Sequence, residues 1–193
     1  WVKGAATLYT REYFEQVKAR LNPGGVVTQW VPLYQSNDAT VASEIATFLA
    51  VFPNATVWGN PRNGVGFDVV LLGSVEPARI DLDAIDARLA RADHAGVAAV
   101  LANVGFLTAT EVLATFAGMA RDLDPWLQHA EINSDSNLRL QYLAGMSSTA
   151  QSGGPIYDHI LSFRRIPAEL FVGSEERQQA LRVRRLLVSV AVY

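Results

Sequence analysis

The sequence contains no cysteine and only three histidines among its 193 residues. Without cysteine, the chain forms neither disulfide bonds nor thiolate metal sites. The histidines, His94, His129 and His159, stand far apart and lack the spacing of metal ligands, so we expect no metal site. The sequence also shows no Ser/His/Asp order and no glycine-rich loop of the kind that cradles phosphate. These absences remove several common enzyme classes from consideration.

Long apolar runs and an excess of positive charge are absent as well. No apolar run reaches the roughly 20 residues of a membrane-spanning helix. The formal net charge is −3, and no basic stripe alternates with aromatic residues, so nucleic acid is not an expected partner. A mildly acidic balance would suit a cationic substrate, but it is also the ordinary state of soluble proteins.

Residues 1–34 predict a helix, a tight turn and a strand. Thr10 is a candidate N-cap for a helix that begins at Arg11 and has apolar residues at three- and four-residue steps. The Asn-Pro-Gly-Gly sequence at 22–25 ends this helix, because proline cannot continue the helical ladder and glycine accepts a left-handed cap. Residues 26–31 then read as a strand buried on both faces. Together they form the second half of a βαβ unit.

A second helix and an antiparallel pair of strands follow. Asn37 caps a predicted helix over 38–51, which presents one apolar face. Strands are expected at 55–58 and 66–72, joined by a Gly/Asn/Pro-rich turn at 59–64. The chain is therefore an α/β protein.

From Ile80 onward the sequence is mainly helical. Helices are predicted at 81–91, at 97–102 and from Thr108 to about Met119, where Thr108 and Glu111 form a capping box. Residues 138–143 alternate like a half-exposed strand. The run SSTAQSGGP at 147–155 has the composition of a flexible linker, and the final LLVSVAVY, rich in β-branched residues, predicts a last strand.

Two stretches resemble one protein family. They are LYTREYF…L-x-PGG-V-x-x-QW near the start and, about a hundred residues later, INSDSNLRLQYLAG. Both are similar to spermidine synthase-like proteins, in particular to the bacterial branch in which this domain is often fused to a membrane region. The resemblance implies the C-terminal half of a Rossmann-like, methyltransferase-type sheet, which ends in an antiparallel hairpin. The resemblance places the family domain at 1–146. The composition of 147–155 predicts a linker, and 156–193 then form a mainly helical extension.

The same resemblance implies an aminopropyltransferase. The family transfers an aminopropyl group from decarboxylated S-adenosylmethionine to a diamine such as putrescine, and no cofactor is bound permanently. The chain begins at Trp1 rather than at a methionine, so we expect it to begin inside the domain, with the catalytic aspartate upstream and no catalytic residue identified within it. The expected partner is a small polyamine; a homodimer and a fused membrane region remain open. The protein is expected in the cytoplasm. The alternative is that a missing N-terminal region associates it with a membrane.

Four residues are candidates for the site. The resemblance places a substrate-side glutamine near Gln29, and the alternative is a buried glutamine that satisfies loop backbone. Tyr34 could cover the pocket or pack on the next helix, and Tyr9 could line the cofactor side or act as a hydrophobic staple. Trp58 stands near the place where true spermidine synthases carry a tyrosine–proline pair, and its ring could face a cation. We expect Gln29 to project into the cleft, within reach of Tyr34 or of the turn at 59–64.

The missing tyrosine–proline pair keeps other functions open. One is a methyltransferase that uses S-adenosylmethionine on an unknown acceptor. Another is a binding module that keeps the fold without the chemistry. Asp135, in the Asn-Ser-Asp motif, is expected to orient a loop by accepting backbone N–H bonds rather than to catalyse.

Overall fold

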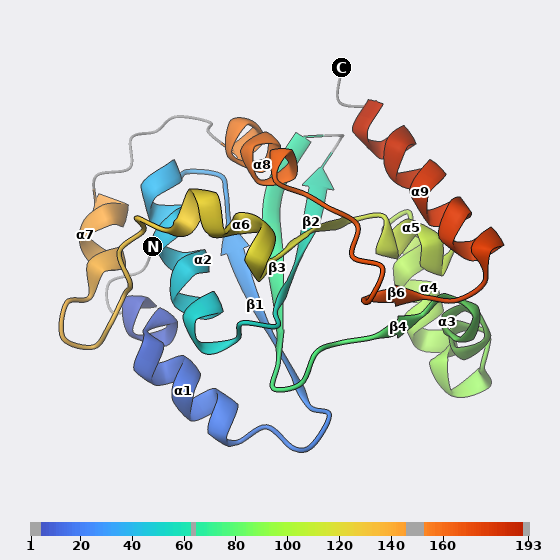
Figure 1. Ribbon diagram of the computed structural model, residues 1–193, viewed down its shortest axis with the longest axis horizontal. Helices are drawn as coiled ribbons and strands as arrows, with labels where there is room; N and C mark the ends of the chain where they lie inside the picture. Colours follow the sequence, from blue (N-terminus) through green and yellow to red (C-terminus); the bar gives the residue numbers. More distant parts are fainter. Residues whose placement is uncertain (1–4, 63–64, 146–152, 191–193) are drawn as a thin grey trace. The chain divides into compact units, whose positions relative to one another are not determined.

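The computed structural model describes residues 5–62, 65–145 and 153–190, which belong to two compact units (Figure 1). The first unit contains Trp1–Pro77 and Ala117–Arg165, and the second contains Ala78–Phe116 and Ile166–Tyr193. Each unit is thus built from two separate stretches of the chain. These boundaries differ from the predicted segments, because residues 156–165 of the expected extension belong to the first unit. That 1–146 forms part of a family domain stays a prediction.

A four-stranded sheet forms the centre of the first unit. Its strands lie in the order β1-β3-β2-β5. Strand β3 pairs antiparallel with both β1 and β2, so β1 and β2 run in the same direction on either side of it. Their bounds are Val26–Pro32 for β1, Thr56–Arg62 for β2, Val65–Ser74 for β3 and Phe116–Met119 for β5. The strands predicted at 26–31, 55–58 and 66–72, and the antiparallel pairing of the last two, are confirmed.

The prediction that 26–31 is buried on both faces is wrong. Strand β1 lies at an edge of the sheet, and its residues alternate between exposed and more buried positions. Trp30 and Trp58 both stand opposite Val70 of β3, so the three side chains share one face, and 44% of Trp30 is exposed. Val31 and Val69, on the other face, are fully buried. The predicted turn at 59–64 is also wrong in part: β2 continues to Arg62 with a bulge after Asn60, and 63–64 lie outside the described residues.

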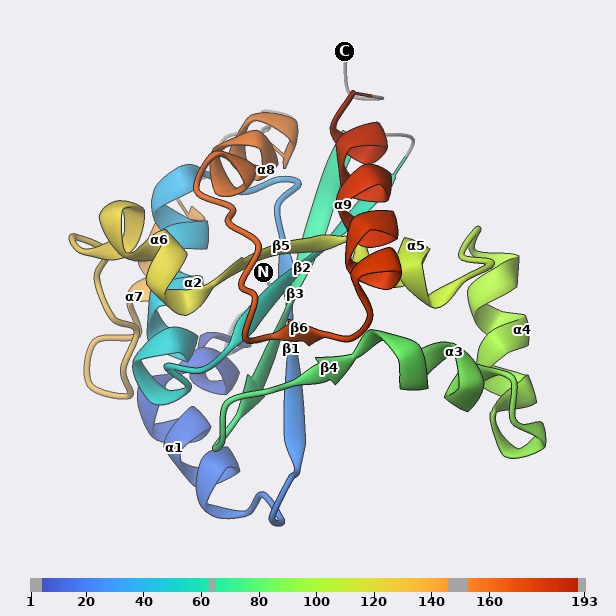
Figure 2. The same cartoon turned by 45° about the vertical axis from the view of Figure 1, so that its right-hand side comes forward.

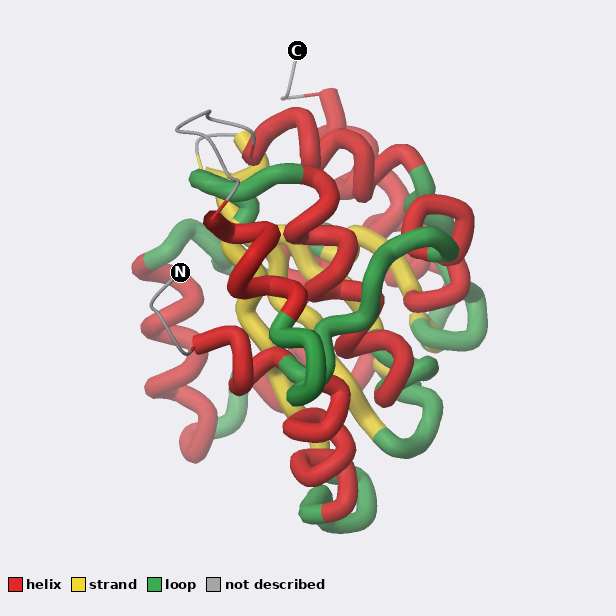
Figure 3. The backbone as a smooth tube through the Cα atoms, turned by 90° about the vertical axis from the view of Figure 1, so that its left-hand side faces the viewer, coloured by secondary structure: helices red, strands yellow, loops and turns green. Residues whose placement is uncertain are grey.

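Helices cover the buried face of this sheet. Helix α2 (Asp38–Val51) and helix α6 (Ala120–Leu127) lie on the same side (Figures 1 and 2). Seen from that side, the strands lie behind the helices (Figure 3). The core contains Phe14 of helix α1 (Arg11–Ala19), whose ring meets Phe48 of α2 edge-on at 5.0 Å. The unit also contains η1 (Ala5–Tyr9), α7 (Arg139–Gly145) and α8 (Gly153–Ser162).

The caps predicted for α1 and α2 are confirmed. Thr10 Oγ1 accepts a hydrogen bond from the Tyr13 N–H at 3.3 Å, and Asn37 Oδ1 accepts one from the Thr40 N–H at 2.8 Å. Each cap satisfies an N–H of the first turn that has no partner inside the helix. These local signals fix where both helices begin.

Helix α8 packs on the sheet through two positions without side chains. A Cβ atom on Gly59 of β2 or Gly66 of β3 would collide with the ring of Tyr157, which is buried in the core. The two glycines therefore form the slot that receives this tyrosine. Residues 153–155, predicted as linker, instead begin α8, while 147–152 lie outside the described residues.

Helix α7 replaces the strand predicted at 138–143, which is therefore wrong. Leu140 and Leu143 are buried three positions apart, a spacing that also fits a helix. The start of the helix is held by side chains, because Asn137 Oδ1 accepts from the Arg139 N–H at 3.0 Å and Asn133 Oδ1 accepts from the Leu140 N–H at 3.1 Å. These hydrogen bonds cap the first turn and favour a helix, although the apolar and polar residues at 138–143 alternate as they would in a strand.

The second unit is mainly helical. A short parallel pair joins β4 (Ile80–Asp81) to β6 (Phe171–Val172). Asp83 of α3 accepts from Ser174 N at 2.6 Å, and the Glu111 carboxylate forms an ion pair with Arg184 at 3.1 Å. The helices are α3 (Leu82–Leu89), η2 (Ala92–His94), α4 (Ala95–Asn103), α5 (Ala109–Leu113) and α9 (Glu175–Val190). None of the helices in the described part of the chain combines the length and apolar character needed to cross a bilayer.

Two predictions for this unit are wrong and one is confirmed. The capping box of Thr108 and Glu111 is present. The helix that it begins ends at Leu113 rather than near Met119, because residues 116–119 pair with β2 as strand β5. The LLVSVAVY stretch continues α9 as far as Val190 instead of forming a strand; 191–193 lie outside the described residues.

The exposed edge at β1 leads to a first prediction. Val26 is 55% exposed, and an unpaired strand edge is a template for pairing with another chain. We expect residues 1–193, produced alone, to self-associate through β1. The substitution Val26→Lys should weaken this association about tenfold, equivalent to about 1.4 kcal/mol, because two copies would bring like charges together. Sedimentation velocity measures the effect, with Val100→Lys on the exposed side of α4 as the matched control. Equal association of both variants would exclude the β1 edge as the interface.

Candidate functional site

A pocket of about 360 Å³ lies at the end of β1 in the first unit. We call it the β1-end pocket. Three segments form its walls: η1, the last residues of β1 and the loop that leads into α2. Its lining residues are Ala5, Tyr9, Trp30, Pro32, Tyr34, Gln35 and Ser36.

The loop between β1 and α2 shapes one side of the pocket. Gln35 has a positive φ of 53°, a left-handed conformation that turns the chain toward the Asn37 cap. Tyr34 stacks on Phe67 of β3, with ring centroids 4.3 Å apart, and tilts against Trp30 at 6.2 Å. The aromatic wall is thus fixed by strand β3. Tyr34 therefore packs on strand β3 and not on the next helix, and it also lines the pocket.

Tyr9 and Gln29 form a polar pair beside this wall. Their side chains are hydrogen-bonded to each other, and Gln29 Nε2 also donates to the Trp30 carbonyl at 3.1 Å. The pKa of the Tyr9 phenol is raised above its ordinary value of 10.0, mainly by burial and further by the Glu44 carboxylate, while the hydrogen bond to Gln29 lowers it. Two residues predicted separately, one for the cofactor side and one for the substrate side, are therefore in direct contact.

Glu44 is a buried acidic residue that the sequence did not lead us to predict; it does not line the β1-end pocket, but it acts electrostatically on Tyr9. It belongs to α2, is 1% exposed, and its Oε1 atom has no hydrogen-bond partner among the described residues. Burial raises its pKa well above the ordinary 4.5, because desolvation disfavours the charged form. A signal was available: Glu44 stands three residues after Val41 and four before Phe48, on the face predicted to be apolar. An acidic residue at such a position marks a buried carboxyl group.

The predicted position of Gln29 is wrong. Strand β1 does not end there but continues to Pro32, and Gln29 stands opposite Leu71 of β3 in the middle of the pairing. Gln29 is not among the residues that line the β1-end pocket. Its side-chain partner is Tyr9 rather than Tyr34 or the 59–64 segment. Gln29 therefore supports the pocket through Tyr9.

Trp58 is not brought to the pocket. Its indole Nε1 donates to Thr56 Oγ1 at 2.8 Å within the same strand. Strand β2 is separated from β1 by β3, and Trp58 is not a lining residue of the β1-end pocket. Its predicted part in holding a substrate cation gains no support from this placement.

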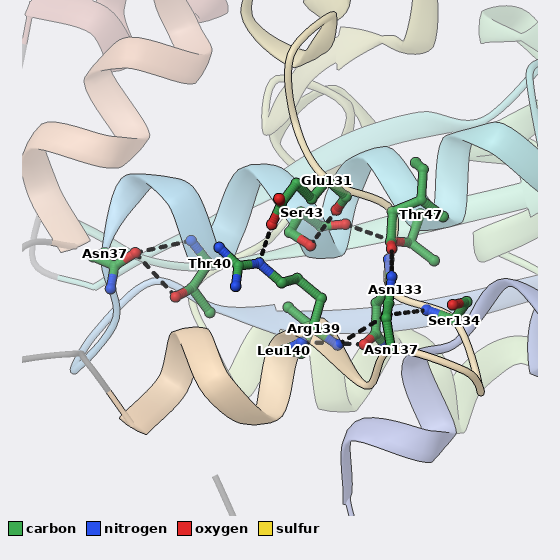
Figure 4. Close-up of polar contacts among 11 residues, drawn as sticks. Asn37, Thr40, Ser43, Thr47, Glu131, Asn133, Ser134, Asn137, Arg139 and Leu140 are labelled. Atoms are coloured by element: carbon green, nitrogen blue, oxygen red, sulfur yellow. Dashed lines mark hydrogen bonds and ion pairs between the residues drawn. The ribbon is translucent and has the colours of Figure 1, made fainter.

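The Asn-Ser-Asp motif anchors the segment that carries Tyr9. Asn133 is fully buried, and its Nδ2 donates to the carbonyls of Ala6 and Tyr9, both at 2.9 Å. Its backbone N–H donates to Thr47 Oγ1 of α2 at 2.8 Å, and Figure 4 shows it between α2 and the start of α7. Asn133 thus joins η1, α2 and α7. It fixes the backbone from which Tyr9 reaches the pocket.

The side chain that orients the loop of the Asn-Ser-Asp motif is Asn137, not Asp135 as expected. Asn137 Oδ1 accepts the N–H groups of Ser134 and Arg139, both at 3.0 Å (Figure 4). Asp135 instead contributes its backbone N–H, which donates to Glu12 Oε2 at 3.0 Å. The motif is therefore structural, as predicted, but the side chain that accepts the backbone N–H groups of the loop is that of Asn137 and not that of Asp135.

A second pocket, of about 370 Å³, lies near the start of α2. Asp38 there accepts from Trp126 Nε1 at 3.0 Å and contacts His159 Nδ1 at 3.3 Å. The three side chains make a polar and aromatic cluster joining α2, α6 and α8. Within the described residues, no three or more His, Cys, Asp or Glu side chains gather as metal ligands would.

Comparison with known proteins identifies no relative. No family model matches the sequence, and no curated protein matches it. The residues of the β1-end pocket and the sequence resemblance are therefore the only indications of function.

Proposed function

We propose that the protein is a spermidine synthase-like transferase and that the β1-end pocket is its acceptor side. The observation that carries the proposal is the hydrogen-bonded pair of Tyr9 and Gln29 next to an aromatic wall of Trp30 and Tyr34, with the Glu44 carboxylate acting electrostatically on Tyr9. Aromatic faces and acidic groups suit an alkyl ammonium substrate. The proposed reaction moves an aminopropyl group from decarboxylated S-adenosylmethionine to a diamine such as putrescine.

The chemistry is a direct displacement. A deprotonated amine nitrogen attacks the carbon next to the sulfonium, the carbon–sulfur bond breaks, and the neutral thioether leaves with the bonding electrons. The new ammonium proton passes to a carboxylate, which the resemblance places upstream of Trp1. The residues of this chain would align the acceptor: Tyr34 and Trp30 limit where its carbon chain lies, and the Tyr9–Gln29 pair offers polar contact. Alignment supplies a large part of the rate in such reactions.

The sheet topology supports the proposal. Strands β1 and β2 run in the same direction and are connected through α2, while β3 lies between them and antiparallel to both. A strand, a helix and then an antiparallel pair are how methyltransferase-type sheets end. Ligands of open α/β sheets bind beyond the carboxyl ends of the parallel strands, and the β1-end pocket lies at that end of β1.

A binding module on the same fold is the second candidate. Trp58 stands where a tyrosine would hold the attacking amine, and it is tied to Thr56 away from the pocket. Incubation of the full-length protein with putrescine and either decarboxylated or intact S-adenosylmethionine separates the candidates. Mass spectrometry should detect a product heavier by one aminopropyl group. A methylated product would instead indicate a methyltransferase, and no product with either donor would support the binding module.

Gln29→Ala tests the pocket directly. We expect turnover in the full-length enzyme to fall by about 10- to 100-fold, the effect of about 1.5–3 kcal/mol, because Tyr9 loses the hydrogen bond that orients its phenol. Gln29 acts as a positioning residue, so kcat should fall more than KM rises. Thr28→Ala, on the exposed side of the same strand, is the matched control and should leave turnover unchanged. A lowered melting temperature with normal turnover of the folded fraction would make Gln29 purely structural.

A further inference from the structure

The pocket near the start of α2, of about 370 Å³, has charged groups of both signs on its walls. We call it the α2-start pocket. Three parts of the first unit form it: the first turns of α2, the end of α6 with the residues that follow, and α7. Among the described residues, it shares no lining residue with the β1-end pocket. Its volume lies within the range of about 300–1,000 Å³ that small-molecule sites occupy.

Arg139 of α7 brings a positive charge to one wall. Its backbone N–H donates to Asn137 Oδ1 at 3.0 Å, and its Nε forms an ion pair with the Glu131 carboxylate. Figure 4 shows the side chain extended from α7 toward the first turns of α2. A guanidinium group has five N–H donors in one plane, and the contacts within the described residues use only the donor on Nε. The two Nη groups are therefore available to a carboxylate, whose geometry their fork matches.

Asp38, the first residue of α2, brings a negative charge to the same pocket. Trp126 Nε1 donates to its Oδ2 at 3.0 Å, and His159 Nδ1 lies 3.3 Å from its Oδ1. These two contacts fix the rotation of the carboxylate, although 55% of the side chain stays exposed. An ionised carboxylate has about four lone-pair sites. Asp38 is therefore able to accept hydrogen bonds from a ligand ammonium group as well.

The pocket also has an apolar part. Ala42 of α2 and Leu143 of α7 are buried and line it together with the ring of Trp126. The Trp126 ring lies 5.3 Å from the ring of His159, which in turn lies 5.2 Å from that of Phe163. These contacts hold the indole in place. The α2-start pocket therefore combines opposite charges with an apolar surface.

We infer that the α2-start pocket binds a small apolar amino acid, with its carboxylate on the Arg139 Nη groups, its ammonium group on Asp38 and its side chain against the apolar part. A carboxylate without an amine would meet two negative charges, Asp38 and Glu131, and one positive charge. An amine without a carboxylate would leave the Arg139 fork unused. A zwitterion pairs with both charges, and a branched apolar side chain is stabilised by leaving water. This site is separate from the β1-end pocket, so its ligand does not depend on the proposed transferase reaction.

Calorimetric titration of the full-length protein with L-leucine and two analogues tests the inference. The analogue 4-methylpentanoate lacks the ammonium group of leucine, and 3-methylbutylamine lacks its carboxylate. Asp38→Asn should weaken leucine binding about 10- to 100-fold and should not weaken binding of 4-methylpentanoate, which has no ammonium group to lose. Arg139→Gln should weaken leucine binding to a similar extent and should not weaken binding of 3-methylbutylamine.

Asp135→Asn and Arg11→Gln are the matched controls, because they remove the same charges at exposed positions of the first unit. Both should bind leucine as the wild type does. In the wild type itself leucine should bind more tightly than either analogue, a comparison that holds even where a variant does not fold. The inference is overturned if the wild type does not bind leucine, or if the folded Asp38→Asn and Arg139→Gln variants bind it with wild-type affinity. Tighter binding of 3-methylbutylamine than of leucine would also overturn it, since the pocket would then recognise a cation alone.

Discussion

Asn133→Ala is expected to lower the free energy of unfolding of the first unit by about 3–5 kcal/mol. The side chain of Asn133 is fully buried and makes hydrogen bonds with the Ala6 and Tyr9 carbonyls and the Leu140 N–H. Alanine would leave these three backbone groups unpaired in a site that excludes water. Each unpaired buried group costs about 1–3 kcal/mol, and partial relaxation reduces their sum.

Tryptophan fluorescence during urea unfolding measures this effect, because Trp30, Trp58 and Trp126 all belong to the first unit. The matched control is Asn137→Ala in the same loop. Asn137 also makes side-chain hydrogen bonds to backbone, but they are partly exposed, so its replacement should cost about 1 kcal/mol. Equal losses for the two variants would show that the buried bonds of Asn133 do not hold η1, α2 and α7 together.

The second large effect is a pH dependence of stability that comes from Glu44. Its pKa in the folded protein lies well above the ordinary 4.5 because of burial. Between these two pKa values the folded protein binds more protons than the unfolded chain, so stability falls as the pH rises through this window. Below the window both states are protonated and there is no penalty. Above it the full penalty applies, about 1.4 kcal/mol for each pKa unit between the two values.

Glu44→Gln should remove this dependence. The variant keeps the shape of the neutral side chain and cannot ionise, so its stability should match the wild type at about pH 4 and exceed it at about pH 8. Urea unfolding at a series of pH values gives the comparison, and Glu15→Gln, at an exposed position on α1, is the control. Parallel curves for wild type and Glu44→Gln would mean that Glu44 is ionised in the folded protein, contrary to its buried position.

The features predicted correctly from the sequence depend on residues close together along the chain. The caps at Thr10, Asn37 and Thr108 each involve a side chain and an N–H three residues later, and all are present. Antiparallel pairing of β2 with β3 follows from two short strands adjacent in sequence. Such signals need no knowledge of the rest of the fold.

The failures concern contacts that the pattern of a single helix or strand does not show. The sequence of 116–119 fits a helix equally well, and only pairing with β2 makes it a strand. Leu138 and the residues after it alternate as a strand would, but Asn133 and Asn137 hold the start of a helix there. At the site, the contact of Tyr9 with Gln29 depends on how η1 and β1 pack. No local pattern contains that information.

The division of the first unit into two stretches of sequence also sets the order in which it can form during synthesis. Ser43 and Thr47 of α2 bond to Glu131 and Asn133, 88 and 86 residues further along the chain. When α2 leaves the ribosome, these partners and strand β5 do not yet exist. The nascent chain must therefore hold an unfinished sheet and an uncovered helix while Ala78–Phe116 is made. Closing such long loops slows folding, which makes this interval the time when the growing chain depends most on chaperones.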